Sequence, residues 1–536
     1  MLQSGGMWRA ALLGAFCITA YAQPFIFYRG IVNAASYSPP GLPNGSIARG
    51  SIFSIFGRNF GPAQGAQVSE FPLGTTFQGL GVSVCQNGSC IPAIPLYVSA
   101  GQVNALMPSN APLGPVSMRV IYNGQGGYYA SATVVASSFG IVAANGGGFG
   151  PASTTPLITF DAPARPGQTI VLWGTGLGPG LNADNVAPQA GDLPVPVEIW
   201  VGGKRATKRY SGRSPCCAGL DQVVFDVPPD TPSGCYVPVQ VRTAGQVVSN
   251  SVSIAVSSDG AACSDSFNPL SQIFRAGGRL GLIFANRVDA LLNLFDSEPQ
   301  QTVEFALASF RRENGGPFAY NTLASLPPPG SCTVHGFTGE FLGGSVIPSF
   351  RASGGELDAG ATLSMGAVTA GRSTYYSATL AGLPKRGLPA SVLDRPVRVQ
   401  GTGGADVPAI SFDIPAASPI QWTNRAAGQA ISRSDGFRVN WDIEGTVLIA
   451  GINANVPANA TGIFVCTALP GTKSFVVPPY ITQSLPPSID RTPGEFRFGY
   501  AMVGSLTAVA AASRIAGLDA LAALTASWSA RAVAYR

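Results

Sequence analysis

The chain has 536 residues, too many for one hydrophobic core, and we expect about three domains. Only 11% of the residues are charged, whereas 67 are glycine and 44 are proline, a composition typical of turn-rich β proteins. The net charge of +5 is spread along the chain without a basic cluster, which argues against a nucleic-acid partner.

Residues 1–22 have the pattern of a secretory signal peptide. Arg9 precedes the apolar run from Ala10 to Ala20, and Ala20-Tyr21-Ala22 supplies the small residues of a cleavage site before Gln23. This run is too short to span a bilayer, and no later run has the length of a transmembrane helix. We therefore predict a mature chain without a transmembrane segment, secreted or held at the cell surface, with the periplasm as an alternative location.

Two copies of a strand that enters a glycine-rich turn lie 117 residues apart. The matched positions are Gly50, Gly57, Gly61 and Pro62 in the first copy and Gly167, Gly174, Gly178 and Pro179 in the second. Both copies lie in segments of short β-type runs separated by frequent turns, which is typical of a two-sheet sandwich. This duplication predicts one sandwich over residues 23–142 and another over 150–257, with residues 143–150 as the linker.

The same region resembles a known family. The resemblance is carried by residues 31–37, the first glycine box (50–62), residues 96–104 and the second box (163–179). These motifs, in this order, resemble the Solibacter-type uncharacterised C-terminal domain of secreted acidobacterial proteins. The resemblance implies two Ig-like units similar to the IPT/TIG type. It implies no catalytic residue, because the family has no established activity.

Residues 264–536 show no clear repeat and are predicted to form a larger β-rich region of one or two subdomains. Short apolar or alternating runs recur there, and proline clusters separate them. The alanine-rich segment from Leu506 to Leu524 is compatible with a helix or a strand, and the alternation that follows it favours a strand. The predicted fold class is therefore all-β, with two tandem Ig-like β-sandwiches followed by this region.

Eight cysteines remain after the signal peptide is removed, and an even number in an exported chain predicts disulfides. They are Cys85, Cys90, Cys216, Cys217, Cys235, Cys263, Cys332 and Cys466. Cys85 and Cys90 flank a hairpin-turn sequence and should pair. For the rest we expect Cys216 or Cys217 with Cys235, the other with Cys263, and Cys332 with Cys466. A zinc site is disfavoured, because there is no C-x-x-C pair and His335 is the only histidine.

The glycine box Gly174-x-Gly176-x-Gly178 resembles a phosphate-binding loop, but such a loop needs a helix directly after it. Pro179-Gly180 follows instead, so a tight turn between strands is the better interpretation. His335 is the only histidine that could act as a base, but the chain has no nucleophile motif such as G-x-S-x-G, so we expect an ordinary loop side chain there. We expect no cofactor.

Two sets of carboxylates are candidate sites. Glu340, Glu356 and Asp358 would suit a glycosidase pair, but their glycine-rich surroundings favour solvated turns. Asp184, Asp221, Asp226 and Asp230 could bind calcium, but they lack a ligand spacing. We therefore predict no catalytic residue and no metal site.

Aromatic residues in the C-terminal region suggest a possible binding platform. Trp422 and Trp441, with Tyr375 and Tyr376, could stack on a sugar or a peptide, although such residues more often belong to a core. The function predicted from the sequence is a secreted, non-catalytic adhesion or recognition protein for an unknown glycan or protein ligand. The alternatives are a polysaccharide-acting enzyme with a catalytic C-terminal region, and a structural spacer of the cell envelope.

Overall fold

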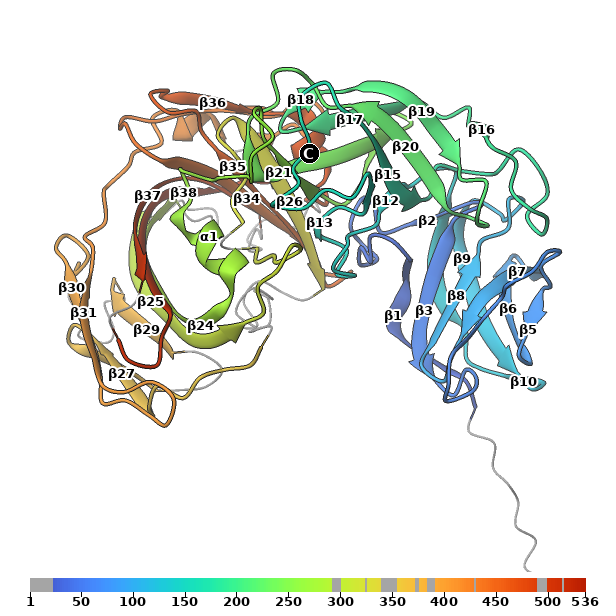
Figure 1. Cartoon of the computed structure of the whole chain (residues 1–536), viewed down its shortest axis with the longest axis horizontal. Coiled ribbons are helices and arrows are strands. Elements are labelled where there is room, and N and C mark those ends of the chain that lie inside the picture. Colours follow the sequence, from blue (N-terminus) through green and yellow to red (C-terminus); the bar gives the residue numbers. More distant parts are fainter. Residues whose placement is uncertain are drawn as a thin grey trace, which may run out of the picture.

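The computed structural model is almost entirely β-structure, and its three parts follow one another around an arch (Figure 1). It describes residues 23–291, 300–322, 325–338, 354–371, 376–382, 391–428, 430–488, 499–512 and 515–536. The predicted signal peptide lies outside the described residues. The predicted fold class is confirmed, with two Ig-like sandwiches followed by a larger β-rich region.

The first sandwich is one continuous sheet of eleven strands folded over its own core. Its strands are β1 (Phe25–Asn33), β2 (Ile47–Ala48), β3 (Ile52–Arg58), β4 (Ala66–Gln67), β5 (Thr76–Phe77), β6 (Leu80–Gln86), β7 (Ser89–Val98), β8 (Gln102–Leu106), β9 (Gly114–Tyr122), β10 (Gln125–Gly126) and β11 (Ala130–Val135). The long strand β7 pairs with β8 in one layer and with β6 in the other, so it joins the two layers. Phe53, Val103 and Met118 are fully buried between them.

The second sandwich has two separate sheets of six strands. One contains β12 (Gly140–Ile141), β14 (Thr154–Thr155), β15 (Thr169–Thr175), β16 (Gly191–Asp192), β19 (Thr207–Arg213) and β20 (Asp221–Asp226); the other contains β13 (Gly150–Pro151), β17 (Val197–Val201), β18 (Lys204–Arg205), β21 (Gly234–Thr243), β22 (Val247–Val248) and β23 (Val252–Val256). Alternate residues of facing strands, such as Leu172 and Val239, are buried between the sheets, as period-2 side-chain direction requires.

The strands that carry the two glycine boxes pair with their neighbours in the same register. Phe56 of β3 lies opposite Gln102 of β8, and Trp173 of β15 lies opposite Gln222 of β20. Phe56 and Trp173 directly precede Gly57 and Gly174, which are matched positions of the two boxes. Each box therefore occupies the same strand of its sandwich and has the same neighbour.

The C-terminal region begins with a short helix and is dominated by an eight-stranded sheet. Its elements are α1 (Pro269–Ala276), β24 (Gly278–Leu291), β25 (Gln300–Glu313), β26 (Ser331–Thr338), β27 (Thr362–Met365), β28 (Val368–Gly371), β29 (Tyr376–Ala381), β30 (Val397–Gly401), β31 (Ile410–Ile414), a 3-10 turn (Arg425–Gly428), β32 (Ala430–Ile431), β33 (Phe437–Asn440), β34 (Val447–Asn455), β35 (Ala460–Thr467), β36 (Ser474–Val477), α2 (Pro479–Gln483), β37 (Tyr500–Ala512), β38 (Ala520–Ala532) and β39 (Ala534–Tyr535). The large sheet has the order β26-β35-β34-β37-β38-β24-β25-β29 and curls around α1 (Figure 1).

The alanine-rich segment lies in the two long strands β37 and β38, so the strand interpretation holds there. Strand β38 is covered on both faces. Ala522 and Leu524 pack with Leu270 of α1, while Ala523 lies in the core shared with the β27–β31 strands. Strands that are buried on both faces are often near-continuously apolar, which explains why the first part of β38, from Ala520 to Leu524, lacks the alternation expected of a half-buried strand.

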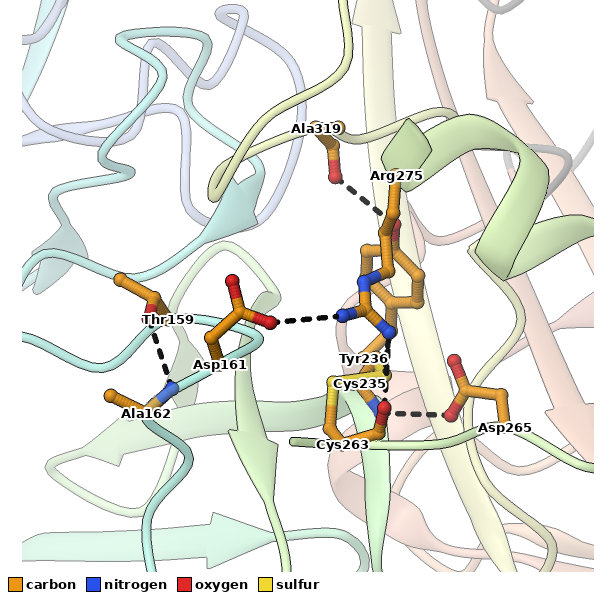
Figure 2. Close-up of a disulfide and its surroundings, with 9 residues drawn as sticks. All are labelled: Thr159, Asp161, Ala162, Cys235, Tyr236, Cys263, Asp265, Arg275 and Ala319. Carbon is orange, nitrogen blue, oxygen red and sulfur yellow. Dashed lines mark hydrogen bonds and ion pairs between the residues drawn. A yellow bond between two sulfur atoms is a disulfide. The ribbon is translucent and has the colours of Figure 1, made fainter. Parts of the chain in front are cut away.

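A disulfide and an arginine fasten the second sandwich to the C-terminal region (Figure 2). Cys235, at the start of β21, is bonded to Cys263. The backbone nitrogen of Cys235 also donates to Asp265 Oδ1 at 2.8 Å. Arg275 of α1 donates to the Cys263 carbonyl at 3.0 Å and lies 3.7 Å from Asp161. Helix α1, which begins the C-terminal region, is therefore anchored to the second sandwich.

The segment predicted as a linker is packed where all three parts meet. Asn250 Nδ2 donates to the Gly148 carbonyl at 2.6 Å, and Gly148 has a φ of +75°. A Cβ atom on Gly148 would lie 2.1 Å from the Ser36 carbonyl oxygen, so glycine is required there. The ring of Phe149 lies 5.6 Å from the ring of His335 in β26. The segment that connects the two sandwiches is therefore packed against all three parts of the molecule.

His335 is buried in this junction among aromatic rings. Its side chain is 4% exposed, and its neighbours include Phe149, Tyr320 and Phe337. Burial lowers the pKa of His335 to about 4. The imidazole is therefore neutral in the folded protein at physiological pH and serves as a core side chain of β26, so the loop position expected for His335 is wrong.

We predict that acid weakens the fold through His335. In the unfolded chain this group takes up a proton near pH 6.5, whereas in the folded chain it does so only near pH 4. Unfolding is therefore favoured progressively as the pH falls through this window, by about 3 kcal/mol in total, since one pKa unit corresponds to about 1.4 kcal/mol. The measurement is the free energy of unfolding from pH 8 to pH 4 for the natural chain and for His335→Phe. The variant should show a flatter profile, and parallel profiles would contradict the assignment.

Candidate functional site

The glycine-rich turn after β15 does bind an anion, but the anion is a carboxylate of the protein itself. The backbone nitrogens of Gly176 and Leu177 each donate to Asp221 Oδ2 at 2.8 Å. Arg213 Nη1 lies 2.7 Å from Asp221 Oδ1, and both side chains are buried. Burial raises the pKa of Asp221 to about 6 and is opposed by the Arg213 charge and by the two backbone donors. At neutral pH the carboxylate is therefore ionised. Its two oxygens accept hydrogen bonds from Arg213 and from the two backbone nitrogens of the turn.

This buried ion pair fixes the loop that runs from Ser214 to Leu220. Arg213 Nη2 also donates to the Gly178 carbonyl at 2.7 Å, which ties the loop to the glycine turn. Thr175 Oγ1 donates to the Gly219 carbonyl at 2.6 Å and accepts from the Ile52 backbone nitrogen of the first sandwich at 2.8 Å. The loop is thereby held against the neighbouring sandwich.

The loop carries the adjacent cysteines Cys216 and Cys217, which are bonded to each other. They cover one side of a pocket of about 290 Å³ between the two sandwiches, which we call the seam pocket. Its lining residues are Ile52, Gln67, Val68, Ser69, Glu70, Phe71, Leu73, Leu96, Tyr97, Asn104, Cys216, Cys217 and Ala218. Leu73, buried with Leu106 and packed against Ala218, belongs to a small apolar cluster that spans both sandwiches.

The seam pocket combines aromatic rings with hydrogen-bonding groups. Phe71 and Tyr97 supply the rings, and Glu70 supplies the one carboxylate found between residues 23 and 160. Asn104 Oδ1 accepts from Ser54 Oγ and from Gln102 Nε2, both at 2.9 Å, which orients the amide and leaves its NH₂ group to donate. The pocket can therefore both stack on a ligand and hydrogen-bond it.

One glycine allows Tyr97 to take its place in the pocket wall. A Cβ atom at Gly65 would lie 2.2 Å from the Tyr97 hydroxyl oxygen. The side-chain contacts of Cys216 are also defined, because Ser214 Oγ lies 3.3 Å from its sulfur and accepts from its backbone nitrogen at 3.4 Å. The walls on both sides of the pocket are thus held by their own local contacts.

The structure pairs Cys85 with Cys90 and Cys332 with Cys466, the two pairings that the sequence predicted without alternatives. The predicted bond from Cys216 or Cys217 to Cys235 is wrong. Cys235 begins a strand of the other sheet and is bonded to Cys263 at the joint with the C-terminal region. A bond between adjacent residues closes almost no chain, so Cys216–Cys217 adds little loop-closure entropy. Both residues are exposed and line the pocket.

The predicted ligand platform in the C-terminal region is also wrong. Trp422 and Trp441 are only 4% and 3% exposed, and they belong to a large core cluster with Phe464 and Tyr480. Tyr376 is buried as well, whereas Tyr375 lies outside the described residues. No face of these rings is available to a ligand in the described structure.

The candidate carboxylates are not brought together. Asp226 binds Arg209 and Thr169, Asp230 pairs with Lys204, and Asp184 accepts from Ser109. Asp358 accepts from nearby backbone nitrogens, including that of Gly360 at 3.0 Å. Their remaining candidate partner Glu356 forms a backbone bridge with Arg311, and Glu340 lies outside the described residues. Within the described ranges, no three His, Cys, Asp or Glu side chains are grouped as a metal site.

No family model and no curated protein matches the chain. Among solved structures, SGBP-B from a complex xyloglucan utilization locus in Bacteroides uniformis is similar over 90% of this chain and 93% of its own, with 12% identity and a TM-score of 0.16. A γ-CGTase from Alkalophilic bacillus clarkii shows 10% identity and a TM-score of 0.16 over 68% of this chain, which covers 36% of that enzyme. Domains 5–6 of the S-layer protein SbsC show 13% identity and a TM-score of 0.17, over 44% of this chain and 98% of theirs. The fold assignment therefore rests on the strands themselves. No helix among the described residues has the length and apolar character to cross a membrane.

We predict that Arg213→Met strongly destabilises the protein. Removing one partner of a buried ion pair leaves an uncompensated charge and typically costs roughly 3–5 kcal/mol. Here the stranded group would be Asp221, which is completely buried. The measurement is the midpoint of urea unfolding followed by tryptophan fluorescence.

The matched control is Arg209→Met, which removes an ion pair from the same sheet where the arginine side chain is 62% exposed. Exposed pairs contribute little, so this midpoint should remain close to that of the natural chain. Equal shifts for the two variants would show that the Arg213 pair does not fix the loop.

Proposed function

We propose that the protein is a secreted, non-catalytic recognition protein and that its seam pocket binds one sugar ring of an extracellular glycan. The observation that carries this proposal is the composition of the pocket. Two aromatic side chains, an exposed disulfide, one carboxylate and two amides line a single hollow between rigidly joined sandwiches.

A sugar ring has an apolar face of C–H groups and an edge of hydroxyl groups. The rings of Phe71 and Tyr97 and the polarisable sulfurs of Cys216 and Cys217 suit the apolar face. Glu70 suits the hydroxyl edge, because a carboxylate accepts strong hydrogen bonds. A volume of about 290 Å³ lies at the lower end of the range for small-ligand sites, which suits one ring rather than a chain.

The same residues support binding rather than hydrolysis. Glycoside hydrolysis generally needs two carboxylates that flank the scissile bond. Glu70 is the only carboxylate that lines the seam pocket. A single acceptor is sufficient to hold a hydroxyl group but does not supply an acid and a base together.

Export and ancestry are part of the proposal. Four disulfides join the eight cysteines of the mature chain, which suits an oxidising compartment. The equal register of β3 with β8 and of β15 with β20 supports a tandem duplication. Membership of the Solibacter-type domain family remains a prediction that rests on the sequence motifs.

The test is a screen of the oxidised chain 23–536 against neutral oligosaccharides, followed by calorimetry on the ligands that bind. Tyr97→Ala and Asn104→Ala should each weaken binding about tenfold, which corresponds to roughly 1.4 kcal/mol. Replacing both Cys216 and Cys217 with serine should weaken it as well, because the apolar sulfur surface is lost. Tyr28→Ala is the matched control, since it removes an exposed tyrosine of the same sandwich that lies outside the pocket.

Three results would count against the proposal. Equal affinities for the natural chain and the pocket variants would place the ligand elsewhere. Release of reducing ends during the assay would favour the enzyme alternative. A complete lack of saccharide binding would leave a protein ligand or a spacer role as the better account.

A further inference from the structure

A second surface of the first sandwich exposes an unusual number of aromatic rings. Phe25 and Phe27 of β1 are 37% and 47% exposed, and Tyr128 and Tyr129, after β10, are 70% and 54% exposed. Gln23 connects the two segments, because its Nε2 donates to the Gly126 carbonyl at 2.5 Å. We call this surface, together with Arg58 and Arg119, the aromatic tip.

Arginines lie directly over these rings. The guanidinium carbon of Arg58 is 4.9 Å from the centre of the Phe25 ring, and that of Arg119 is 5.0 Å from the centre of the Tyr129 ring. Cation–π contacts of this kind hold an arginine in place while its outer N–H groups remain free to donate. The tip therefore presents positioned guanidinium groups rather than mobile ones.

The positive charge of the tip has no counter-charge within the first sandwich. Residues 23–142, all of which are described, contain four arginines, no lysine and one carboxylate, Glu70. Glu70 lines the seam pocket and not the hollow at the tip. No carboxylate of the described residues forms an ion pair with Arg58 or Arg119.

The tip also has a shape of its own. Gln23, Pro24, Phe25, Arg58, Asn59 and Tyr128 line an open hollow of about 480 Å³. Asn59 Nδ2 donates to the Gln23 carbonyl at 3.2 Å, which ties the end of β3 to the start of β1. A broad hollow next to exposed rings suits a chain that lies across a surface more than a small ligand that enters a pocket.

We propose that the aromatic tip binds an acidic polysaccharide through its uronate carboxylates. Guanidinium groups match carboxylates in charge and in planar, two-pronged geometry. The neighbouring tyrosine rings offer faces for the sugar rings and hydroxyl groups for their edges. The most exposed rings at the tip are tyrosines rather than phenylalanines, which favours a hydroxylated, hydrated partner over the apolar interior of a membrane. This inference does not depend on the seam pocket, whose carboxylate disfavours an anion.

The experiment is native gel electrophoresis of the chain 23–536 in gels that contain polygalacturonate, alginate or neutral dextran. We expect the natural chain to be retarded by the two acidic polymers only, and the retardation to disappear at about 0.5 M salt because exposed charges are screened. Arg58→Gln combined with Arg119→Gln should lower the apparent affinity at least tenfold. Tyr128→Ala combined with Tyr129→Ala should lower it as well without changing the net charge.

The matched control combines Arg438→Gln with Lys473→Gln in the C-terminal region. It removes two exposed positive charges, and neither side chain forms an ion pair with a carboxylate of the described residues. It should be retarded like the natural chain. Circular dichroism establishes that each variant is folded. If the arginine double variant does not fold, the tyrosine double variant tests the proposal instead.

Equal retardation of the natural chain and both tip variants would overturn the proposal, and so would a lack of retardation by either acidic polymer. Binding to phosphatidylglycerol vesicles without binding to polyuronates would also overturn it and would assign the tip to a lipid surface. Failure of the neutral-sugar screen would refute the seam pocket alone, because the two tests use different ligands and different residues.

Discussion

The carboxylate of Asp221 is the point on which the two sandwiches depend. It is fully buried, and a buried charge is tolerated only when it is paired and hydrogen-bonded. Arg213 and the backbone nitrogens of Gly176 and Leu177 meet that requirement together. The glycines of the box allow the backbone to come this close, since Gly176 and Gly178 both have positive φ values. The conformation of the turn, the direction of the cysteine loop and the shape of the seam pocket follow from this one arrangement.

Both candidate sites include residues of the first sandwich. The seam pocket needs both sandwiches, because the loop with Cys216 and Cys217 comes from the second. The junction around Phe149 and His335 joins both sandwiches to the C-terminal region without a flexible connection. Rigid supports of this kind reduce the entropy lost when a surface binds its ligand.

Local patterns were enough to predict the fold class, the two glycine boxes and the hairpin disulfide of Cys85 and Cys90, because each depends on residues close in sequence. The seam pocket was not predictable, since Glu70, Tyr97 and Cys216 meet only after two sandwiches have packed together. The same reason explains the failure at Trp422 and Trp441, which only tertiary packing places in a core. The arginines of the tip, far apart in sequence, gave no charge cluster to detect. One signal for the seam pocket was present in the sequence, because Glu70 is the only carboxylate among residues 23–160.

The measurement that tests the central claim most directly is hydrogen exchange of the oxidised chain with and without a neutral saccharide that it binds. The account predicts slower exchange in two segments that are distant in sequence, residues 67–73 of the first sandwich and residues 214–220 of the second, with little change around Trp422 and Trp441. Protection confined to the C-terminal region, or to one of the two segments alone, would contradict the claim that the ligand lies in the seam between the sandwiches.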